Sequence, residues 1–225
     1  MEAGRLFFVL KSCKLSKNTS TEKRMQPDFG LRFDKEIYQG DAFELAWQHL
    51  LGAYLCTRID GVLTAGMITE LEVYIGSCDK ACHAWPNKLT PRTATMFKPG
   101  GCAYVFFVYG MYNQFNVVAG PEGTANAILI RALEPIAGIE EMMKRRRCEK
   151  LNHLTTGPGK LCQALAITRR QHDGIDLNGD TVWISPGIEK YEFEARPRIG
   201  IDYAEEYKDM PWRFYIRGNS FISKK

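Results

Sequence analysis

A strand–turn–strand pattern between residues 98 and 119 constrains the fold of this chain more than any other feature. Two apolar, aromatic runs flank Gly110, and glycine at such a turn is typical of a β-hairpin. The tip of this hairpin carries Tyr109, Met111 and Tyr112, which it cannot bury in its own core. We therefore expect an exposed aromatic tip that marks an interaction surface. The alternative is that these rings belong to a sheet core with a partner interface.

Further strands and helices are expected on both sides of this hairpin. An acidic residue at 41 followed by Glu44 is typical of a helix start, and apolar residues then recur at helical spacing up to Gly52. Strands are expected over 62–75, 127–130, 182–184 and 213–216, and helices over 138–151 and from Pro158 onward. Because no repeat or linker divides residues 29–225, we predict a single α+β domain.

Charge and composition limit the classes of protein to consider. The longest apolar run is far short of the ~18 residues of a membrane-spanning helix, so we expect no membrane partner. Residues 1–28 contain six basic and three acidic residues, and so carry +3 of the net charge of +4. We predict a disordered basic tail over 1–28 and an ordered domain over 29–225. Any affinity of that domain for nucleic acid must come from local patches.

The cysteines and the N-terminus bear on the compartment. The seven cysteines form no CxxC pair, and a chain of 225 residues can build a core without disulfides, so we expect a reducing compartment. The apolar run over residues 6–10 is too short for a secretory signal. We therefore expect a protein that is not secreted.

The expected strand over 62–75 carries two glutamates in alternating positions. Glu70, Glu72 and Tyr74 share one face of that strand, and the opposite face is apolar. Two carboxylates about 7 Å apart beside an aromatic ring are candidates for general-base catalysis. The alternative is an ordinary solvated strand face.

A lone arginine interrupts an apolar strand, and a lone histidine follows the glutamate strand. Arg131 needs a partner, which could be Glu70, Glu72 or a ligand phosphate, or it could form a purely structural ion pair. His83 could stack on or hydrogen-bond a ligand. Zinc is not favoured, because the neighbouring cysteines have poor ligand spacing and no second ligand pair follows. We expect no metal.

Two basic features could contact phosphates. Residues 144–147 are four consecutive bases, which could touch a phosphate backbone or form a solvated face. Gly157-Pro158-Gly159-Lys160 is not a Walker A loop, because neither Ser nor Thr follows the lysine. Its helix start could still direct backbone N–H groups toward a phosphate.

Taken together, these residues resemble one family, the alkyladenine (3-methyladenine) DNA glycosylases of the mammalian type. The resemblance runs from about residue 31 to residue 223. It implies a curved, mostly antiparallel sheet with surrounding helices and a protruding β-hairpin. The matching segments, in the family's order and spacing, are residues 70–76, 81–83, 90–93, 96–97, 104–106, 108–112, 116, 129–135, 157–165 and 198–200.

The resemblance implies a catalytic role for three residues. Glu72 matches the general base that activates a water molecule against C1′ of the sugar. Arg131 matches the arginine that helps to position this water and the nucleotide phosphate. The backbone carbonyl of Ile199 is similar to a further ligand of the water.

The resemblance also implies a pocket for a flipped base. Tyr74 and His83 match residues that stack on one side of the base, and Ala81 lies in the same matched segment as His83. Phe106 stands where the best-known members have a tyrosine on the other side. Asn116 matches the residue that excludes guanine by crowding its 2-amino group.

On the DNA side, Tyr109 matches the wedge that fills the space left in the duplex. The resemblance places Met111, Tyr112, Thr90 and Lys160 at the DNA surface. An intercalated side chain partly offsets the cost of opening the stack.

The resemblance therefore implies a monofunctional, monomeric DNA glycosylase without a cofactor. It would hydrolyse the N-glycosidic bond of alkylated or deaminated purines (3-methyladenine, hypoxanthine, ethenoadenine) in double-stranded DNA, in a nucleus or a bacterial cytoplasm. A catalytically silent damaged-DNA binder and a protein–protein module are the alternatives. Three features depart from the family pattern. Phe106 lacks the hydroxyl of a tyrosine, so one hydrogen bond is lost while stacking is kept, and the loop over 85–89 replaces a more glycine-rich stretch; both bear on substrate choice. Residues 1–30 match nothing in the family.

Overall fold

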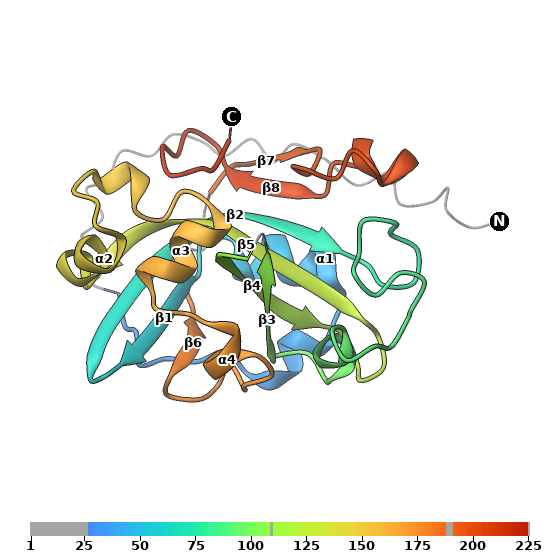
Figure 1. The fold of residues 1–225 in the computed structure, drawn as a ribbon, viewed down its shortest axis with the longest axis horizontal. Helices are drawn as coiled ribbons and strands as arrows, with labels where there is room; N and C mark the ends of the chain where they lie inside the picture. The colour runs from blue at the N-terminus through green and yellow to red at the C-terminus, as the bar shows by residue number, and fades with distance from the viewer. Residues whose placement is uncertain (1–26, 109, 188–190, 225) are drawn as a thin grey trace, which may run out of the picture.

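One antiparallel sheet of eight strands organises the domain (Figure 1). The computed structural model describes residues 27–108, 110–187 and 191–224. The strand order is β3-β4-β5-β2-β1-β6, while β8 pairs with both β2 and β7. The strands are β1 (Tyr54–Ile59), β2 (Val62–Tyr74), β3 (Ala103–Val108), β4 (Tyr112–Ala119), β5 (Asn126–Ala137), β6 (Val182–Ser185), β7 (Phe193–Arg196) and β8 (Arg213–Ile216).

Short helices cover this sheet, so the predicted single α+β domain is confirmed. Helix α3 packs against β4 and β5, and Figure 1 shows it in front of the sheet. Within the described ranges, none of the helices has the length and apolar character needed to cross a membrane. The α-helices are α1 (Ala42–Glu44), α2 (Ile139–Arg146), α3 (Pro158–Ala164) and α4 (Arg169–His172), and a π-helical segment (Leu45–Leu50) follows α1; 3-10 turns span Lys35–Gln39, Ala94–Phe97, Leu151–His153 and Glu205–Asp209.

The predicted hairpin is confirmed. β3 pairs with β4, and Val108 lies opposite Tyr112 across the turn. Gly110 has a φ of +66°, a left-handed conformation that glycine adopts without strain. The side chains of Met111 and Tyr112 are 62% and 44% exposed, so the expected exposed tip is present. Tyr109 lies outside the described residues.

Two predicted helices differ from the structure. The helix expected over 138–151 ends at Arg146, because Arg147 adopts a left-handed conformation and its N–H bonds back to the carbonyls of Lys144 and Met143. The helix after Asp41 begins as predicted, with the Asp41 carboxylate accepting from two backbone N–H groups. It then widens into the π-helical segment, which buries Leu45, Ala46 and Leu50. The sequence did not predict β1, β7 or α4.

The pairing of β2 with its neighbouring strands brings Arg131 close to Glu70 and Glu72. One edge of β2 pairs with β5, while the other pairs first with β1 and then with β8 at residues 70–72. Opposite β5, Glu70 faces Ala132 and Leu71 faces Ile130, so Arg131 is an extra residue in the ladder. Such a β-bulge redirects a side chain, and bulges are common beside active sites. Here it accompanies the approach of Arg131 to both glutamates.

Candidate active site

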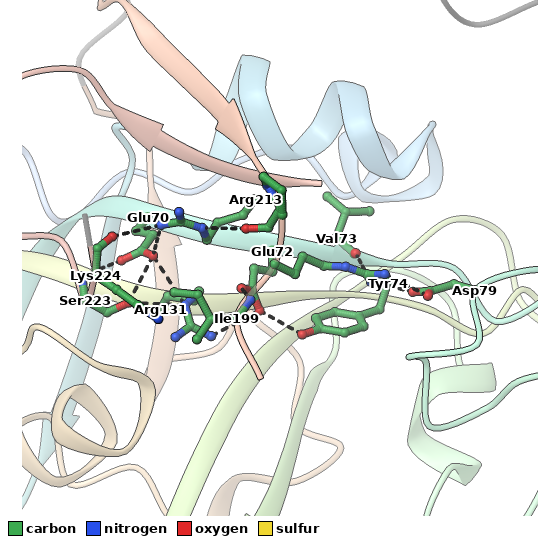
Figure 2. Close-up of polar contacts among 12 residues, drawn as sticks. Glu70, Glu72, Val73, Tyr74, Asp79, Arg131, Ile199, Arg213, Ser223 and Lys224 are labelled. Carbon is green, nitrogen blue, oxygen red and sulfur yellow. Dashed lines mark hydrogen bonds and ion pairs between the residues drawn. The ribbon is translucent and has the colours of Figure 1, made fainter. Parts of the chain in front are cut away.

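Two carboxylates and two guanidiniums form a buried cluster near the C-terminal end of β2 (Figure 2). Glu70 and Glu72 are completely buried, and Arg131 and Arg213 are nearly so. Both glutamates lie on the face that Arg131 approaches, as the alternation predicted, but the alternative of a solvated face is wrong. The strand is buried on both faces at this point. Two negative and two positive charges balance inside the fold, as buried ions require.

Three donors hold the carboxylate of Glu72. Its Oε1 accepts from the backbone N–H of Ile199 at 2.8 Å. Its Oε2 accepts from the Tyr74 hydroxyl at 2.7 Å and from Nη1 of Arg131 at 3.1 Å. These three donors, which come from three different residues, fix the carboxylate in one orientation. Because a carboxylate has about four acceptor positions, Oε1 keeps a free lone pair that could accept from a water molecule.

Arg131 bridges the two glutamates. Its Nε lies 3.4 Å from Glu70, and its Nη1 lies 3.1 Å from Glu72. Burial opposes the positive charge, but the two carboxylates outweigh it and raise the pKa of Arg131 above its ordinary value. The partners expected from the sequence, Glu70 and Glu72, are therefore both confirmed.

A cavity of about 310 Å³ opens in front of this cluster. This volume lies at the lower end of the range for small-molecule sites, which suits a single base better than a larger ligand. Glu72 lies behind the wall, where it bonds to three of the lining residues. The cavity is lined by Tyr74, Ala81, Cys82, His83, Met96, Tyr104, Phe106, Val108, Gln114, Asn116, Ala127, Leu129, Arg131, Pro158, Ile199, Gly200, Ile201 and Tyr203.

Two hydrogen bonds and two aromatic contacts, with Tyr104 and Phe106, fix the His83 ring. Nδ1 lies 3.0 Å from the hydroxyl of Tyr104, and Nε2 lies 3.1 Å from Nη2 of Arg92. The ring centroids of His83 and Phe106 are 4.5 Å apart, edge to face. Because a guanidinium only donates, Nε2 must accept and Nδ1 must carry the proton. His83 is thus neutral in this arrangement.

The ionisation of His83 can be tested directly. His83 keeps part of its surface exposed, but desolvation of the ring against the pocket wall, together with the nearby charge of Arg92, lowers the pKa of His83 to about 4. We expect the ring to stay neutral from pH 5 to pH 8. An NMR titration of the four histidines, with His83→Gln to assign the resonance, checks this; an inflection of the His83 signal near pH 6.5 would contradict it.

Backbone contacts hold two further residues of the cavity wall. Asn116 is buried, and its side-chain amide donates to the carbonyl of Tyr104 at 3.0 Å. Ala81 is buried, and its N–H donates to the carboxylate of Asp79 at 2.9 Å. Both wall positions are therefore rigid, which a shape-selective pocket requires.

The residues expected at the DNA surface form two groups. Tyr112 at the hairpin tip packs against Gly159 at the start of α3, and a Cβ at residue 159 would lie 3.0 Å from the Tyr112 ring. Met111 and Lys160 belong to these same two segments. The Thr90 hydroxyl instead bonds the hydroxyl of Thr93 at 3.0 Å within a short turn.

Two residues of the basic run over 144–147 make hydrogen bonds within the protein. Nε of Arg145 donates to Glu141 at 3.0 Å, and its Nη1 donates to the carbonyl of Ala164. Arg146 bonds the side chain of Gln163. Lys144 is exposed. The run therefore helps to join α2 to α3, and only part of it faces solvent.

Sequence reasoning missed several residues of the site. Asp79 and Arg198 form a fully buried, two-pronged ion pair, and the guanidinium of Arg198 also lies 4.5 Å from the ring centroid of Tyr74. Ser223 and Arg213 hold Glu70. The one available signal was Arg198, which lies in a matched segment directly before Ile199 but had no role assigned to it.

Comparison with known proteins identifies the family. The model of the methylpurine-DNA glycosylase family matches residues 36–220. A relative from Clostridium acetobutylicum is 45% identical over 202 residues, which cover 86% of this chain and 98% of the relative. Another relative, from Bacillus cereus strain G9842, is 47% identical over 202 residues, which cover 84% of this chain and 97% of the relative. Both are provisionally named as 3-methyladenine DNA glycosylases. The resemblance found in the sequence is thereby confirmed, and the chain belongs to the methylpurine-DNA glycosylase family.

Proposed function

We propose that Glu72, Arg131 and Ile199 form the catalytic centre of this DNA glycosylase, an enzyme of base excision repair that removes alkylated purines. The observation that carries the proposal is the buried carboxylate of Glu72, held by three donors directly behind a cavity of the size of a base. Oε1 of Glu72 and the carbonyl of Ile199 hold a water molecule, and Arg131 orients it.

The chemical step is hydrolysis. The water oxygen forms a bond to C1′ while the bond from C1′ to the base nitrogen breaks, and its electron pair leaves with the base. Glu72 takes the proton of the water, and an abasic sugar remains. Because no lysine lines the cavity among the described residues, nothing supports a Schiff base there, and we propose hydrolysis without strand cleavage.

The cavity supports recognition of a flipped purine by its faces. Tyr74 and His83 would stack on one side and Phe106 on the other, with Ala81 and Asn116 limiting the shape. Stacking contributes about 1–3 kcal/mol per base, and electron-rich rings favour cationic, alkylated purines further. A neutral His83 suits this role, since a protonated ring would repel a cationic base.

The hairpin tip and the start of α3 support a DNA-facing surface. Tyr109 would enter the duplex as a wedge, with Met111 and Tyr112 beside it. Lys160 and Thr90 would contact the backbone. We propose that the protein acts as a monomer on chromosomal DNA, in a nucleus or a bacterial cytoplasm according to its source.

The test is single-turnover base release from duplexes that each contain one methylated purine, hypoxanthine or ethenoadenine. We expect release of the methylated purine. The release rates of hypoxanthine and ethenoadenine, compared with it, give the order of preference among the three lesions. Phe106 lacks a hydroxyl, so Phe106→Tyr should alter this ranking while stacking is kept. Tight binding without release of any base would instead establish the catalytically silent DNA binder.

A further inference from the structure

We propose that Glu70, together with Ser223 of the C-terminal segment, is a positioning residue for Arg131. The proposal rests on the proposed catalytic role of Arg131. Glu70 does not line the cavity and makes no hydrogen bond or ion pair with Glu72, yet it contacts the guanidinium of Arg131 on the side opposite Glu72.

Different nitrogens of the Arg131 guanidinium contact different partners. Nε faces Glu70, from which it lies 3.4 Å, and donates to the Ser223 hydroxyl at 3.3 Å. Nη1 faces Glu72 at 3.1 Å. A guanidinium is a rigid plane, so fixing Nε fixes the direction of the remaining nitrogens. Figure 2 shows Glu70 and Ser223 on one side of Arg131, and Glu72 on the other.

Three further hydrogen bonds fix the carboxylate of Glu70. Arg213 donates to its Oε1 at 3.0 Å, and so does the Ser223 hydroxyl at 3.0 Å. The backbone N–H of Ser223 donates to its Oε2. Both carboxylate oxygens are therefore fixed by segments 143 and 153 residues further along the chain.

The C-terminal segment is bound to β2 and β8 around this point. Thr69 donates its hydroxyl to the carbonyl of Phe221, and Arg213 donates to the carbonyl of Lys224 at 3.0 Å. Residues 221–224 thus form a strap whose hydroxyl at 223 touches both Glu70 and Arg131.

Stability alone is a poor explanation for this arrangement. Buried ion clusters contribute little net stability, because removing the charges from water offsets most of their attraction, and apolar replacements are often as stable. Displacing a catalytic group by about 1 Å, in contrast, can cost about 100-fold in rate. The cluster is explained if its function is to hold Arg131 in one orientation toward Glu72 and the water.

The first experiment compares Glu70→Gln with Glu134→Gln as the matched control. Glu134 lies on β5 and bonds Asn219 near the same C-terminal segment, but it contacts no residue of the cluster. We expect Glu70→Gln to lower the single-turnover rate of methylated-purine release at saturating enzyme by about 10- to 100-fold. Affinity for the damaged duplex should stay within about threefold, and the control should match wild type in both.

A second pair of variants decides the question even if Glu70→Gln fails to fold. Ser223→Ala removes only the hydroxyl, and Ser223→Thr keeps it. We expect Ser223→Ala to lower the saturating rate about 3- to 10-fold and Ser223→Thr to restore it, measured at a temperature where both variants are fully folded. A merely structural hydroxyl would change the melting temperature and leave the saturating rate unchanged.

The outcomes separate the two proposals. No release by wild type would overturn the proposed function. Normal release by wild type, with an unchanged saturating rate in a folded Glu70→Gln, would overturn only the positioning role. Equal rates for Ser223→Ala and Ser223→Thr, or a loss confined to DNA affinity, would overturn it too.

Discussion

Replacing Glu72 by glutamine should abolish most base release while DNA binding survives. The amide cannot take the proton of the attacking water, and loss of a general base costs roughly 10²- to 10⁴-fold in rate. The side chain keeps its size in a site that is fully buried, and it lies behind the cavity wall, so the cavity should keep its shape. The measurement is the single-turnover release of a methylated purine, alongside the dissociation constant for the same duplex.

Glu134→Gln serves as the control here as well, because it makes the same chemical change on the neighbouring strand β5. It should release base at the wild-type rate. If Glu72→Gln releases base within about threefold of wild type, Glu72 is not the base and the catalytic assignment fails. If Glu72→Gln unfolds, thermal denaturation will reveal it before kinetics are interpreted.

Replacing Asp79 by asparagine should cause a large loss of stability. Asp79 and Arg198 are both completely buried and bonded through both carboxylate oxygens. Asparagine leaves the Arg198 charge buried without its counter-ion, which costs about 3–5 kcal/mol. Urea denaturation of the wild type and the variant measures the change in the free energy of unfolding.

An exposed ion pair provides the control for Asp79. Glu205 pairs with Lys80 at the surface, with its side chain 67% exposed, so Glu205→Gln should cost less than about 1 kcal/mol. The double replacement Asp79→Leu with Arg198→Met should lose less stability than Asp79→Asn, because it leaves no buried charge. Equal losses for Asp79→Asn and Glu205→Gln would contradict the prediction.

Loss of the ion pair between Asp79 and Arg198 should also disturb residues that line or adjoin the cavity. Arg198 lies against the ring of Tyr74 and donates to the carbonyl of Val73 at 2.9 Å. The next residue along the chain, Ile199, donates to Glu72. The pair thus anchors both the ring of Tyr74 and the backbone N–H that holds the Glu72 carboxylate.

The sequence by itself determined the local elements and the residue types of the site. Alternation along β2 placed Glu70 and Glu72 on one face, and Gly110 between two aromatic runs predicted the hairpin. These features depend on neighbours a few residues apart, whose geometry the backbone period dictates. The family resemblance rests on the same short motifs.

Only the tertiary structure decided how those residues act together. It buried both faces of β2, turned Arg131 toward both carboxylates at a bulge, and brought Ser223 to Glu70 across 153 residues. It also gave His83 its proton position, through Arg92. A sequence pattern specifies which face a side chain occupies, but partners from distant segments are selected by the packing of the whole chain, because burying a charge requires a counter-charge wherever the fold can provide one.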